Sequence, residues 1–287
     1  MPCLVSVIVL NWNGKKLVQD CLQSIERNTE RGKYEVIVVD NGSRDGSVEW
    51  LRGQEQAGKI RLIANPENKG FSHANNQGFL AAKGDYVYLL NNDTRVTKGW
   101  LSEAVKAAEA GKRIGIVGSR LYHPTEKIDE SDFRVVEKQA VCGAGMLVQR
   151  GVIERIGYLD SDHFSPIYGE EIDFCYRARN AGYRVVEAAG SRVVHLGSLS
   201  MVMVHGKEQQ YERLFTNTYK AMLYNLGLAG LLGHLPGYLR VYGLALQKGF
   251  LGLHVKAILN NLRNWKEVQA ERKRRKTGQK IVPRGMP

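Results

Sequence analysis

Short apolar runs alternate with helical patterns over the first two hundred positions of the chain. Residues 5–10 form an apolar run interrupted only by Ser6, as in a strand that is covered on both faces. Residues 15–27 then carry one apolar helical stripe, formed by Leu17, Cys21, Leu22 and Ile25. The same alternation predicts strands at 34–39, 60–64, 86–90 and 114–117, and helices at 47–56, 72–82 and 100–110. Repeated strand–helix units predict an open, mostly parallel α/β sheet.

Polar residues follow the first four predicted strands. Residues 11–14 read Asn-Trp-Asn-Gly, 40–47 Asp-Asn-Gly-Ser-Arg-Asp-Gly-Ser, 65–71 Asn-Pro-Glu-Asn-Lys-Gly-Phe, and 91–94 Asn-Asn-Asp-Thr. Taken singly, each loop suits turns and helix caps. Ligands of an open α/β sheet, however, bind beyond the carboxyl ends of its strands. Four polar clusters at one predicted edge therefore indicate a site.

The pattern changes beyond residue 140. A glycine-interrupted apolar segment covers residues 141–148. A helix with an acidic start at 170–173 runs to about residue 181, where Gly182 ends it as a C-terminal cap. Strands are expected at 183–186 and 192–194, the second ending at His195. From residue 206 onward the pattern is helical and rich in Leu, Gly and Tyr, with Pro236 interrupting it.

Length and composition exclude several classes of protein. The 287 residues are 43% hydrophobic, enough for one large or two small domains with a sizeable core. A disordered tail protein, a collagen-like repeat and a small disulfide-stapled scaffold are excluded. The formal charge is +12, and residues 263–287 hold nine Lys/Arg against two Glu, so +7 lies in this stretch. A basic C-terminal stretch indicates an anionic partner, either membrane lipid or nucleic acid.

The four cysteines, at positions 3, 21, 142 and 175, form no CxxC pair and have no histidine at zinc spacing. We expect reduced thiols in a cytoplasmic protein. The chain opens on a strand pattern rather than on a signal peptide, and no stretch reaches the roughly 18–20 apolar residues of a membrane-spanning helix. The expectation is a soluble or peripheral protein.

In this order the loops resemble those of family 2 glycosyltransferases, inverting nucleotide-sugar enzymes of the GT-A fold. Residues 6–14 are similar to the family's opening strand, 38–47 to its second-strand signature, and 68–76 to its third loop. Residues 89–94 stand at its metal motif, 168–179 at its acceptor-side helix and 193–195 at its late strand. Six motifs in sequence, over roughly residues 4–200, are far more specific than any one of them. The most similar subgroup comprises bacterial rhamnosyltransferase-like enzymes of surface polysaccharide and cell-wall synthesis.

The resemblance implies a domain organisation. Residues 1–205 would form a GT-A, Rossmann-like catalytic domain with a mixed, mostly parallel sheet flanked by helices. Residues 206–287 would form a helical, basic extension. An interfacial helix pair with a polybasic end would bind anionic lipid at the inner face of the cell membrane. The alternative for this extension is an ordinary helical hairpin that packs on the sheet.

The resemblance also implies a divalent metal held by Asp93 and His195. Manganese is favoured over magnesium because imidazole suits Mn²⁺ better. The family motif is usually Asp-x-Asp, whereas this chain has Asn91 at the first position. An amide brings no charge, so Asp93 must supply most of the anionic ligation. Without the family pattern, His195 is best interpreted as a hydrogen-bonded histidine near the core.

The resemblance further implies a general base at the acidic start of this helix. Glu171 is the first candidate and Glu170 the second, since the subgroup's Glu-Asp pair is Glu-Glu here. Burial or like-charged neighbours should raise the pKa of the base above its unperturbed value of about 4.3. Asp173 would bind the acceptor or fix the base. The alternative interpretation is a helix N-terminus that attracts acids through its dipole.

On the donor side, Asp40 resembles the carboxylate that reads a pyrimidine base in this family. Further contacts to nucleotide, ribose or sugar are expected from the strand-end loops, although several of these residues also suit turns. They are Asn11, Asn13, Asn41, Asn68, Gly70, Asn75, Asn91 and Asn92. Arg177 and Arg179 either meet a phosphate or belong to a solvated helix face.

The sequence thus predicts an inverting transferase that moves a rhamnose-like sugar from a dTDP- or UDP-linked donor to a hydroxyl of a glycan or lipid-linked acceptor. One rival is a nucleotidyltransferase, which would need clustered Gly and Lys/Arg after the first strand, where residues 13–16 offer only Asn-Gly-Lys-Lys. The other rival is a binding protein without transferase activity. Nucleic acid is not an expected partner, because no aromatic-interleaved basic face or known module is visible.

Overall fold

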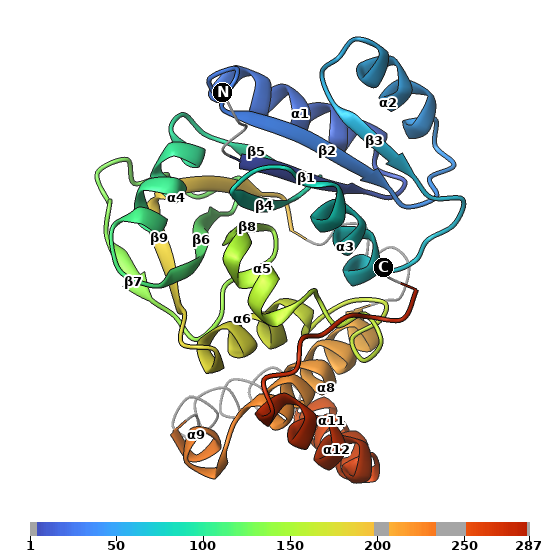
Figure 1. The fold of residues 1–287 in the computed structure, drawn as a ribbon. Helices are drawn as coiled ribbons and strands as arrows, with labels where there is room; N and C mark the ends of the chain where they lie inside the picture. Colours follow the sequence, from blue (N-terminus) through green and yellow to red (C-terminus); the bar gives the residue numbers. More distant parts are fainter. Residues whose placement is uncertain (1–4, 198–206, 234–250, 286–287) are drawn as a thin grey trace.

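The computed structural model describes residues 5–197, 207–233 and 251–285 (Figure 1). Its first part alternates strands and helices much as the apolar pattern predicts. These elements are β1 (Val5–Asn11), α1 (Lys15–Asn28), β2 (Tyr34–Asp40), α2 (Ser47–Gln56), β3 (Arg61–Ala64), α3 (Phe71–Ala81) and β4 (Tyr86–Asn91). Each strand ends at, or directly before, one of the polar clusters noted in the sequence.

The second part of the sheet region is less regular. Its elements are β5 (Thr94–Val96), α4 (Trp100–Glu109), β6 (Ile114–Tyr122), β7 (Val135–Glu137), β8 (Gly145–Gln149), α5 (Arg150–Ile156), α6 (Glu170–Asn180) and β9 (Arg184–His195). The two strands expected at 183–186 and 192–194 are one strand, β9, with an irregular register against β6 between them. Three short elements, β5, β7 and α5, were not predicted.

The strands form one mixed sheet in the order β3-β2-β1-β4-β8-β6-β9-β5, with β7 also paired to β9. β3, β2, β1 and β4 are parallel, as expected, whereas β8 is antiparallel to both β4 and β6. From β1 the chain passes to β2 on one side and returns to β4 on the other. The carboxyl ends of β1 and β4 therefore mark a switch point, where sheets of this kind bind ligands.

Helices cover both faces of the sheet, which explains the continuous apolar runs of its central strands. Successive side chains of a strand point to opposite faces. On β1, Val7 and Val9 join one core with residues of α1, α2 and α4, and Ile8 joins the other with residues of α3, α5 and α6. The described cysteines are free thiols: Cys21 and Cys175 are buried, and Cys142 is exposed.

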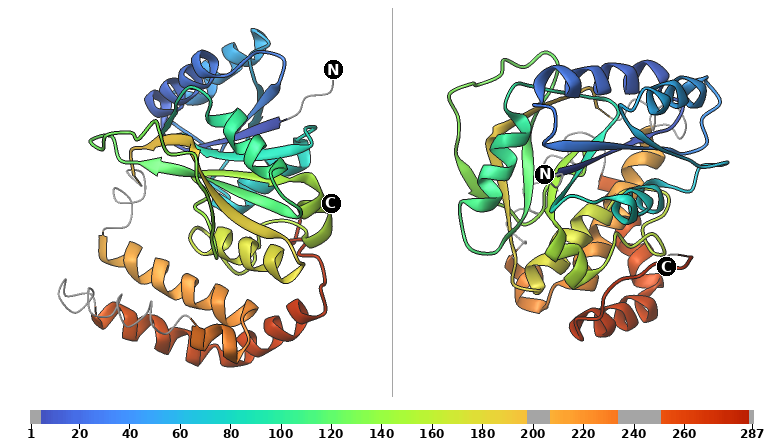
Figure 2. Two further views of the ribbon diagram at one scale, coloured as in Figure 1. Left: turned by 90° about the vertical axis from the view of Figure 1, so that its left-hand side faces the viewer. Right: turned by 45° about the horizontal axis from the view of Figure 1, so that its top comes forward.

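The C-terminal part of the chain forms a helical layer beneath the sheet domain (Figure 2). It comprises α8 (Lys207–Asn225), α9 (Leu228–Gly233), α11 (Leu251–Arg263) and α12 (Trp265–Lys276). α8 contacts α6 of the sheet domain as well as α11 and α12. A small core of Phe164, Ala221, Tyr224 and Val268 joins the layer to the loop before α6. The stretch expected as a basic tail is thus largely the helix α12, packed on α8.

Two glycines allow the C-terminal layer to approach the sheet domain closely. Gly169 precedes α6 at φ 87°, and a Cβ built there would lie 2.8 Å from the backbone oxygen of Asn217 in α8. Gly157 follows α5 at φ 82°, and a Cβ there would lie 2.1 Å from the backbone oxygen of Ile281. That oxygen accepts a hydrogen bond of 2.8 Å from the Tyr158 amide. A side chain at either glycine would separate the two parts.

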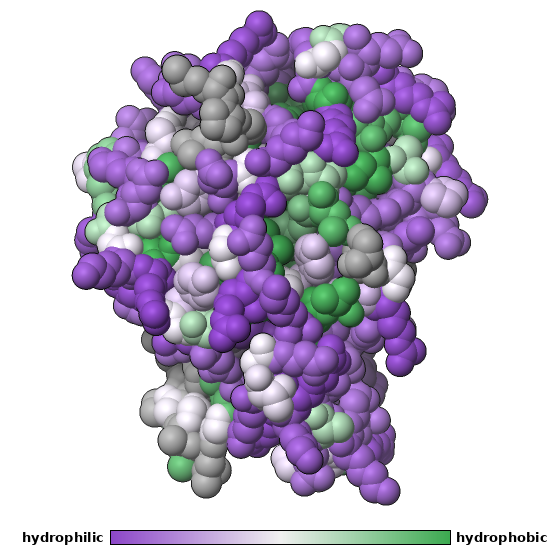
Figure 3. Space-filling view, in the orientation of Figure 1, coloured by the Kyte–Doolittle hydropathy of each residue, from purple (hydrophilic) through white to green (hydrophobic). Residues whose placement is uncertain are grey.

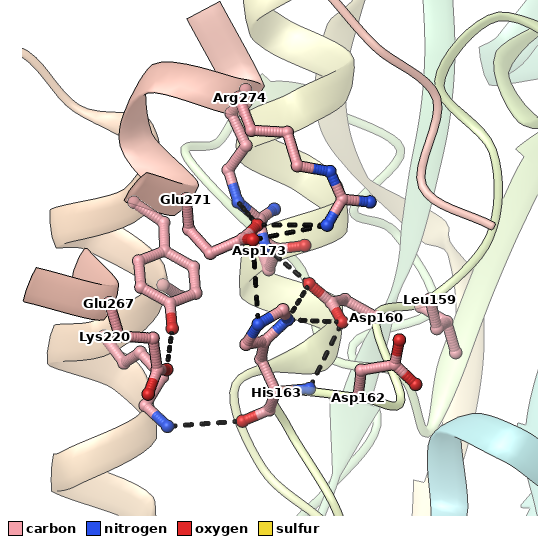
Figure 4. A network of polar contacts seen from close by, with 12 residues as sticks. Leu159, Asp160, Asp162, His163, Asp173, Lys220, Glu267, Glu271 and Arg274 are labelled. Atoms are coloured by element: carbon pink, nitrogen blue, oxygen red, sulfur yellow. Dashed lines mark hydrogen bonds and ion pairs between the residues drawn. The ribbon is translucent and has the colours of Figure 1, made fainter. Parts of the chain in front are cut away.

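A buried ion network fixes α12 to the sheet domain (Figure 4). The Arg275 side chain is only 2% exposed and pairs with Asp173 of α6 and, at 2.5 Å, with Asp160. Its guanidinium also lies 4.8 Å from the centre of the Tyr224 ring. Burial alone would raise the pKa of Asp160, but its hydrogen bond with His163 and the charges of His163 and Arg275 hold that pKa well below its usual value.

Replacing Arg275 by Met should destabilise the fold by about 3–5 kcal/mol, because two buried carboxylates lose the cation that they share. Urea unfolding, followed by circular dichroism, measures this change in the free energy of unfolding. The matched control is Lys273→Met, two residues away on the exposed side of α12, which should change stability by no more than about 0.5 kcal/mol. Equal losses in the two variants would contradict the role given to Arg275.

Candidate active site

The ends of the parallel strands bring the polar clusters together. Asn11 is paired in register with Asp40 across β1 and β2, and the last residue of β4 lies opposite Leu10. The buried Asn11 amide donates to Oδ2 of Asp40 at 2.8 Å and accepts from Nδ2 of Asn92 at 2.7 Å. Three of the predicted donor-site residues thus form one hydrogen-bonded chain across the switch point.

The loop after β2 closes over the loop after β1. The Ser43 amide donates to Oδ1 of Asp40 at 2.9 Å, and the Ser43 hydroxyl accepts from the Asn13 amide at 2.8 Å. Oδ1 of Asn13, which has φ 48°, in turn accepts from the amide of Arg44 at 2.8 Å. Both oxygens of the fully buried Asp40 therefore already accept a hydrogen bond within the chain, and the carboxylate orders these two loops.

The third loop is built on Asn41. Its Nδ2 donates to Oδ1 of Asn68 at 2.8 Å and to the backbone oxygen of Gly70 at 3.3 Å. Its Oδ1 accepts from the amide of Lys69 and from Nδ2 of Asn65. Asn41 and Asn68 therefore shape this loop with their own side chains, and Gly70, at φ 82°, completes the turn.

The helix α3, which follows the third loop, carries two buried asparagines. Asn75 donates from Nδ2 to the backbone oxygen of Phe71, one turn earlier in α3. Asn76, which was not predicted as a site residue, makes a pair of hydrogen bonds with the backbone of Leu159. The side chain of Asn76 thus holds α3 to the segment at Leu159, whereas the hydrogen bond of Asn75 lies within α3.

Asp93 and His195 are brought together by the short strand β5. β5 pairs with β9 so that Thr94 lies opposite His195, and the amide of Leu196 donates to the backbone oxygen of Asp93. Nε2 of His195 lies 3.3 Å from Oδ1 of Asp93. Both atoms are buried, and neither has a hydrogen-bond partner among the described residues. Leaving a buried polar atom unpaired costs about 1–3 kcal/mol, so this pair is poised for a further ligand.

The start of α6 carries two acids that each have one unpartnered oxygen. Oε2 of Glu170 and Oε2 of Glu171 are buried and lack hydrogen-bond partners within the described chain. The pKa of Glu170 is raised well above its usual value, mainly by burial and secondly by the charge of Glu171. Burial likewise raises the pKa of Glu171. Because two close carboxyls titrate as a coupled pair, the raised pKa values belong to the pair rather than to either acid alone.

The loop before β8 links the two unpartnered pairs. Cys142 has exposed surface, but its thiol group is buried. This burial is the main cause that raises the pKa of the thiol to about 11, and the charge of Glu171 is the second cause. Glu170 and Asp93 act on the thiol in the same direction. A Cβ built on the next residue, Gly143, would lie 3.7 Å from Cβ of Glu171. Asp93 and the two glutamates therefore face the same region of the molecule.

Asp173 does not join this group. Its carboxylate accepts from Nε of Arg177 at 2.8 Å and from Nδ2 of Asn225 at 2.7 Å, and it pairs with Arg275. A phosphate contact was one expectation for Arg177. Its side chain is instead buried and donates to the backbone oxygens of Ile156 and Tyr158. Both side chains hold α6 in place, and neither is free for a substrate.

The donor set at Asp93 and His195 fits a divalent ion. It offers one carboxylate oxygen and one imidazole nitrogen, and ions of this class complete their coordination with water and substrate phosphate oxygens. Asn91 is half-buried at the end of β4, two residues before Asp93. The described residues contain one cluster of three metal-ligand side chains, Asp160, His163 and Glu271. Because Arg275 and Arg274 already pair with its acids, that cluster is an ion network rather than a cation site.

The fold and the strand-end loops agree with what comparison with known proteins finds. Residues 6–135 match the model of glycosyl transferase family 2. The chain is also 27% identical over 198 residues to the glycosyltransferase AglE of Haloferax volcanii, covering 64% of each protein. It is 28% identical over 229 residues to an uncharacterized protein of Sinorhizobium fredii, covering 69% of this chain but only 25% of that protein. The chain thus spans less than two thirds of the length of these relatives.

Solved structures share the fold over most of the chain. A mannosyltransferase of Pyrobaculum calidifontis in complex with GDP-Man and Mn²⁺ superposes with a TM-score of 0.67 at 20% identity, covering 91% of this chain and 87% of the other. TarS of S. aureus in complex with UDP-GlcNAc gives 0.60 at 16% identity, covering 79% and 68%. The predicted GT-A-like fold, a mixed α/β sheet flanked by helices with further helices at the C-terminus, is confirmed.

Replacing Glu170 by Gln should stabilise the protein at neutral pH. Since the folded chain raises the pKa of Glu170 above its ordinary value of 4.5, the folded state holds this proton more tightly than the unfolded state. Stability contributed by the protonated acid is therefore lost as the pH rises, and glutamine, which cannot ionise, escapes that loss. Thermal unfolding between about pH 4 and 8 should show a gain in melting temperature that grows with pH. Glu109→Gln, an exposed control on α4, should show none.

Proposed function

We propose that this chain is an inverting glycosyltransferase that uses a nucleoside-diphosphate sugar. One observation carries the proposal: Asp93 and His195 on one side, and Glu170 and Glu171 on the other, present buried and unpartnered polar atoms toward the same region. That region adjoins the loops after β1, β2 and β4. A pair of metal-ligand atoms opposite a raised-pKa acid pair is what glycosyl transfer from a diphosphate requires.

The donor would lie across the carboxyl ends of the strands. Its base and ribose would meet the loops ordered by Asp40, Asn11 and Asn41, and its diphosphate would face Asp93 and His195. A divalent ion bound there, with Mn²⁺ favoured, supplies positive charge to the leaving diphosphate. The family match and the nucleotide sugars of the solved relatives support this placement. Within that class we favour a dTDP- or UDP-linked, rhamnose-like donor.

The acid pair would activate the acceptor. As the acceptor oxygen forms its bond to the anomeric carbon, the bond from that carbon to the diphosphate oxygen breaks, and the electron pair leaves with the diphosphate. The proton of the acceptor hydroxyl passes to a carboxylate, for which Glu171 is our first choice and Glu170 the second. The raised pKa of the pair makes its ionised member a stronger base than an ordinary glutamate. Attack from the face opposite the leaving group inverts the anomeric carbon.

We further propose that the acceptor is a glycan or lipid-linked molecule, met at the inner face of the cell membrane. None of the described helices is long and apolar enough to cross a bilayer. α11 nevertheless has an exposed apolar stripe, on a different face from the residues that it buries against α8. The stripe consists of Leu251, Val255, Ile258, Leu259 and Leu262.

Cations adjoin this stripe. Arg263 ends α11, and Lys266 follows the exposed Trp265, with which α12 begins. The surface around the C-terminal helices is otherwise largely hydrophilic on the face shown in Figure 3. An amphipathic helix with basic neighbours and an interfacial tryptophan has the composition of an element that lies in the headgroup region of an anionic membrane.

Asp93→Ala and Glu171→Gln should each abolish most of the transfer activity. Loss of a metal ligand and loss of a general base each lower the rate by about 10²–10⁴-fold. Hydrolysis or transfer of UDP- and dTDP-sugars with added Mn²⁺ measures this. The matched control is Asp85→Ala, at the exposed opposite end of β4. Absence of turnover by the unmodified chain with every donor and acceptor tested, or full activity of Asp93→Ala, would refute the proposed function.

Replacing Leu259 and Leu262 together by Ser should weaken binding to anionic vesicles by about tenfold or more, since each buried leucine contributes about 1.5–3 kcal/mol. Vesicle flotation measures the bound fraction. Val135 and Val136, exposed apolar residues of β7 in the sheet domain, are replaced by Ser as the control. A double serine variant of α11 that floats as well as the unmodified chain would rule out the stripe as the membrane contact.

A further inference from the structure

A basic pocket lies between the sheet domain and the C-terminal layer, apart from the candidate active site. It has a volume of about 320 Å³, and its lining includes Arg155 at the end of α5, Arg177 on α6, and Arg272, Arg275 and Lys276 on α12. No Asp or Glu occurs among the described residues that line it. Glu170 and Glu171 begin α6, whereas the pocket adjoins its last residues, about 15 Å away at a rise of 1.5 Å per residue.

The five cations are not equally neutralised. Arg177 and Arg275 pair with Asp173 and Asp160, which lie behind them. The side chains of Arg155, Arg272 and Lys276 form no hydrogen bond or ion pair with any part of the chain that the structure describes. Like charges that converge on a recess repel one another and concentrate positive potential there, which favours an anion.

One of the residues that line the pocket has a buried donor without a partner. Nε of Arg275 makes no hydrogen bond to the described residues, although the whole side chain is only 2% exposed. The acid near it, Oε2 of Glu271, lies at 3.8 Å, which is beyond hydrogen-bond distance. A buried N–H without a partner calls for an explanation, and an oxygen of a bound ligand supplies one.

We propose that this pocket binds the phosphate group of an anionic ligand. Guanidinium groups match the oxygens of a phosphate with planar, charge-assisted hydrogen bonds, and three unpaired cations balance a phosphate monoester or a diphosphate. The volume is at the lower end of the range for ligand pockets, so it accommodates a phosphate headgroup rather than a whole nucleotide sugar. The ligand is either the headgroup of an anionic lipid or a soluble phosphate compound.

The position of the pocket gives such a ligand a structural consequence. Its walls come from α5 and α6 on one side and from α12 on the other, so an anion there would join the C-terminal layer to the helix that carries Glu170 and Glu171. This site is separate from the donor site, and its occupation does not depend on transferase activity. The inference therefore goes beyond the proposed function and can fail or succeed independently of it.

Calorimetric titration tests the pocket with two probes, inorganic pyrophosphate and short-chain phosphatidic acid, both in the presence of a metal chelator. The test variant combines Arg155→Gln, Arg272→Gln and Lys276→Gln, which removes the three unpaired cations and leaves the buried ion network intact. The matched control combines Lys98→Gln, Lys112→Gln and Lys273→Gln, which removes the same charge from exposed positions outside the pocket. Circular dichroism and the melting temperature verify that both variants fold.

The unmodified chain should bind at least one probe at a single saturable site. The pocket variant should weaken that binding by about tenfold or more, equivalent to about 1.4 kcal/mol, while the control variant should retain it. Asp93→Ala should also retain it, which separates this site from the candidate metal site. Vesicles of phosphatidylcholine with and without phosphatidic acid then identify the source, since a headgroup site makes flotation depend on phosphatidic acid and on the pocket cations.

Three outcomes would overturn the proposal. They are the absence of saturable binding of both probes to the unmodified chain, equal binding by the pocket variant, and an equal loss in the control variant. Binding of pyrophosphate alone supports the pocket with a soluble phosphate compound as its ligand. Transferase activity is measured on the same preparations. The two measurements distinguish a protein that binds the probes but lacks transferase activity from a protein that is active but does not bind the probes.

Discussion

The arrangement of the molecule depends on the buried guanidinium of Arg275. It lies between Asp173, on the helix that carries the candidate base, and Asp160, in the segment that leads to that helix. Neither carboxylate could remain charged in this position without a cation, because transfer of an unpaired ion from water to the interior costs several kcal/mol. The position of α6 is therefore determined jointly by the sheet beneath it and by a helix formed almost at the end of the chain.

The ion pair between Arg275 and Asp173 also distinguishes Asp173 from Glu170 and Glu171, the other two acids at the start of α6. Asp173 is neutralised by Arg275 and Arg177, so it serves as a structural residue. Glu170 and Glu171 receive no such cation, and their burial leaves them with raised pKa values and unpartnered oxygens. A helix start that attracts acids through its dipole would treat all three alike. The difference among them arises from packing against the C-terminal layer, and it leaves two acids with raised pKa values at the position proposed for the base.

Much of the sheet was predictable because its signals are local. Apolar runs with polar ends located β1, β2 and β4 to within a residue or two, and the order of the loops indicated the fold. β5 escaped prediction because three residues carry no periodicity, yet its pairing with β9 is what places Asp93 beside His195. The role of Asp173 escaped for a different reason: its partner is about a hundred positions away, and charge along a sequence does not show which cation becomes buried.

The net charge of +12 therefore comes from basic residues that lie in different environments. Within α12, Arg275 is an internal cation that folding requires, whereas Arg272 and Lys276 remain unpaired in a recess and Lys273 faces solvent. A helix in which adjacent basic residues differ this much in burial cannot act only as a flexible, polybasic tail. Any anion that approaches α12 meets a surface whose position is fixed relative to α6. An anion bound between these helices would therefore contact the helix that begins with the acid pair.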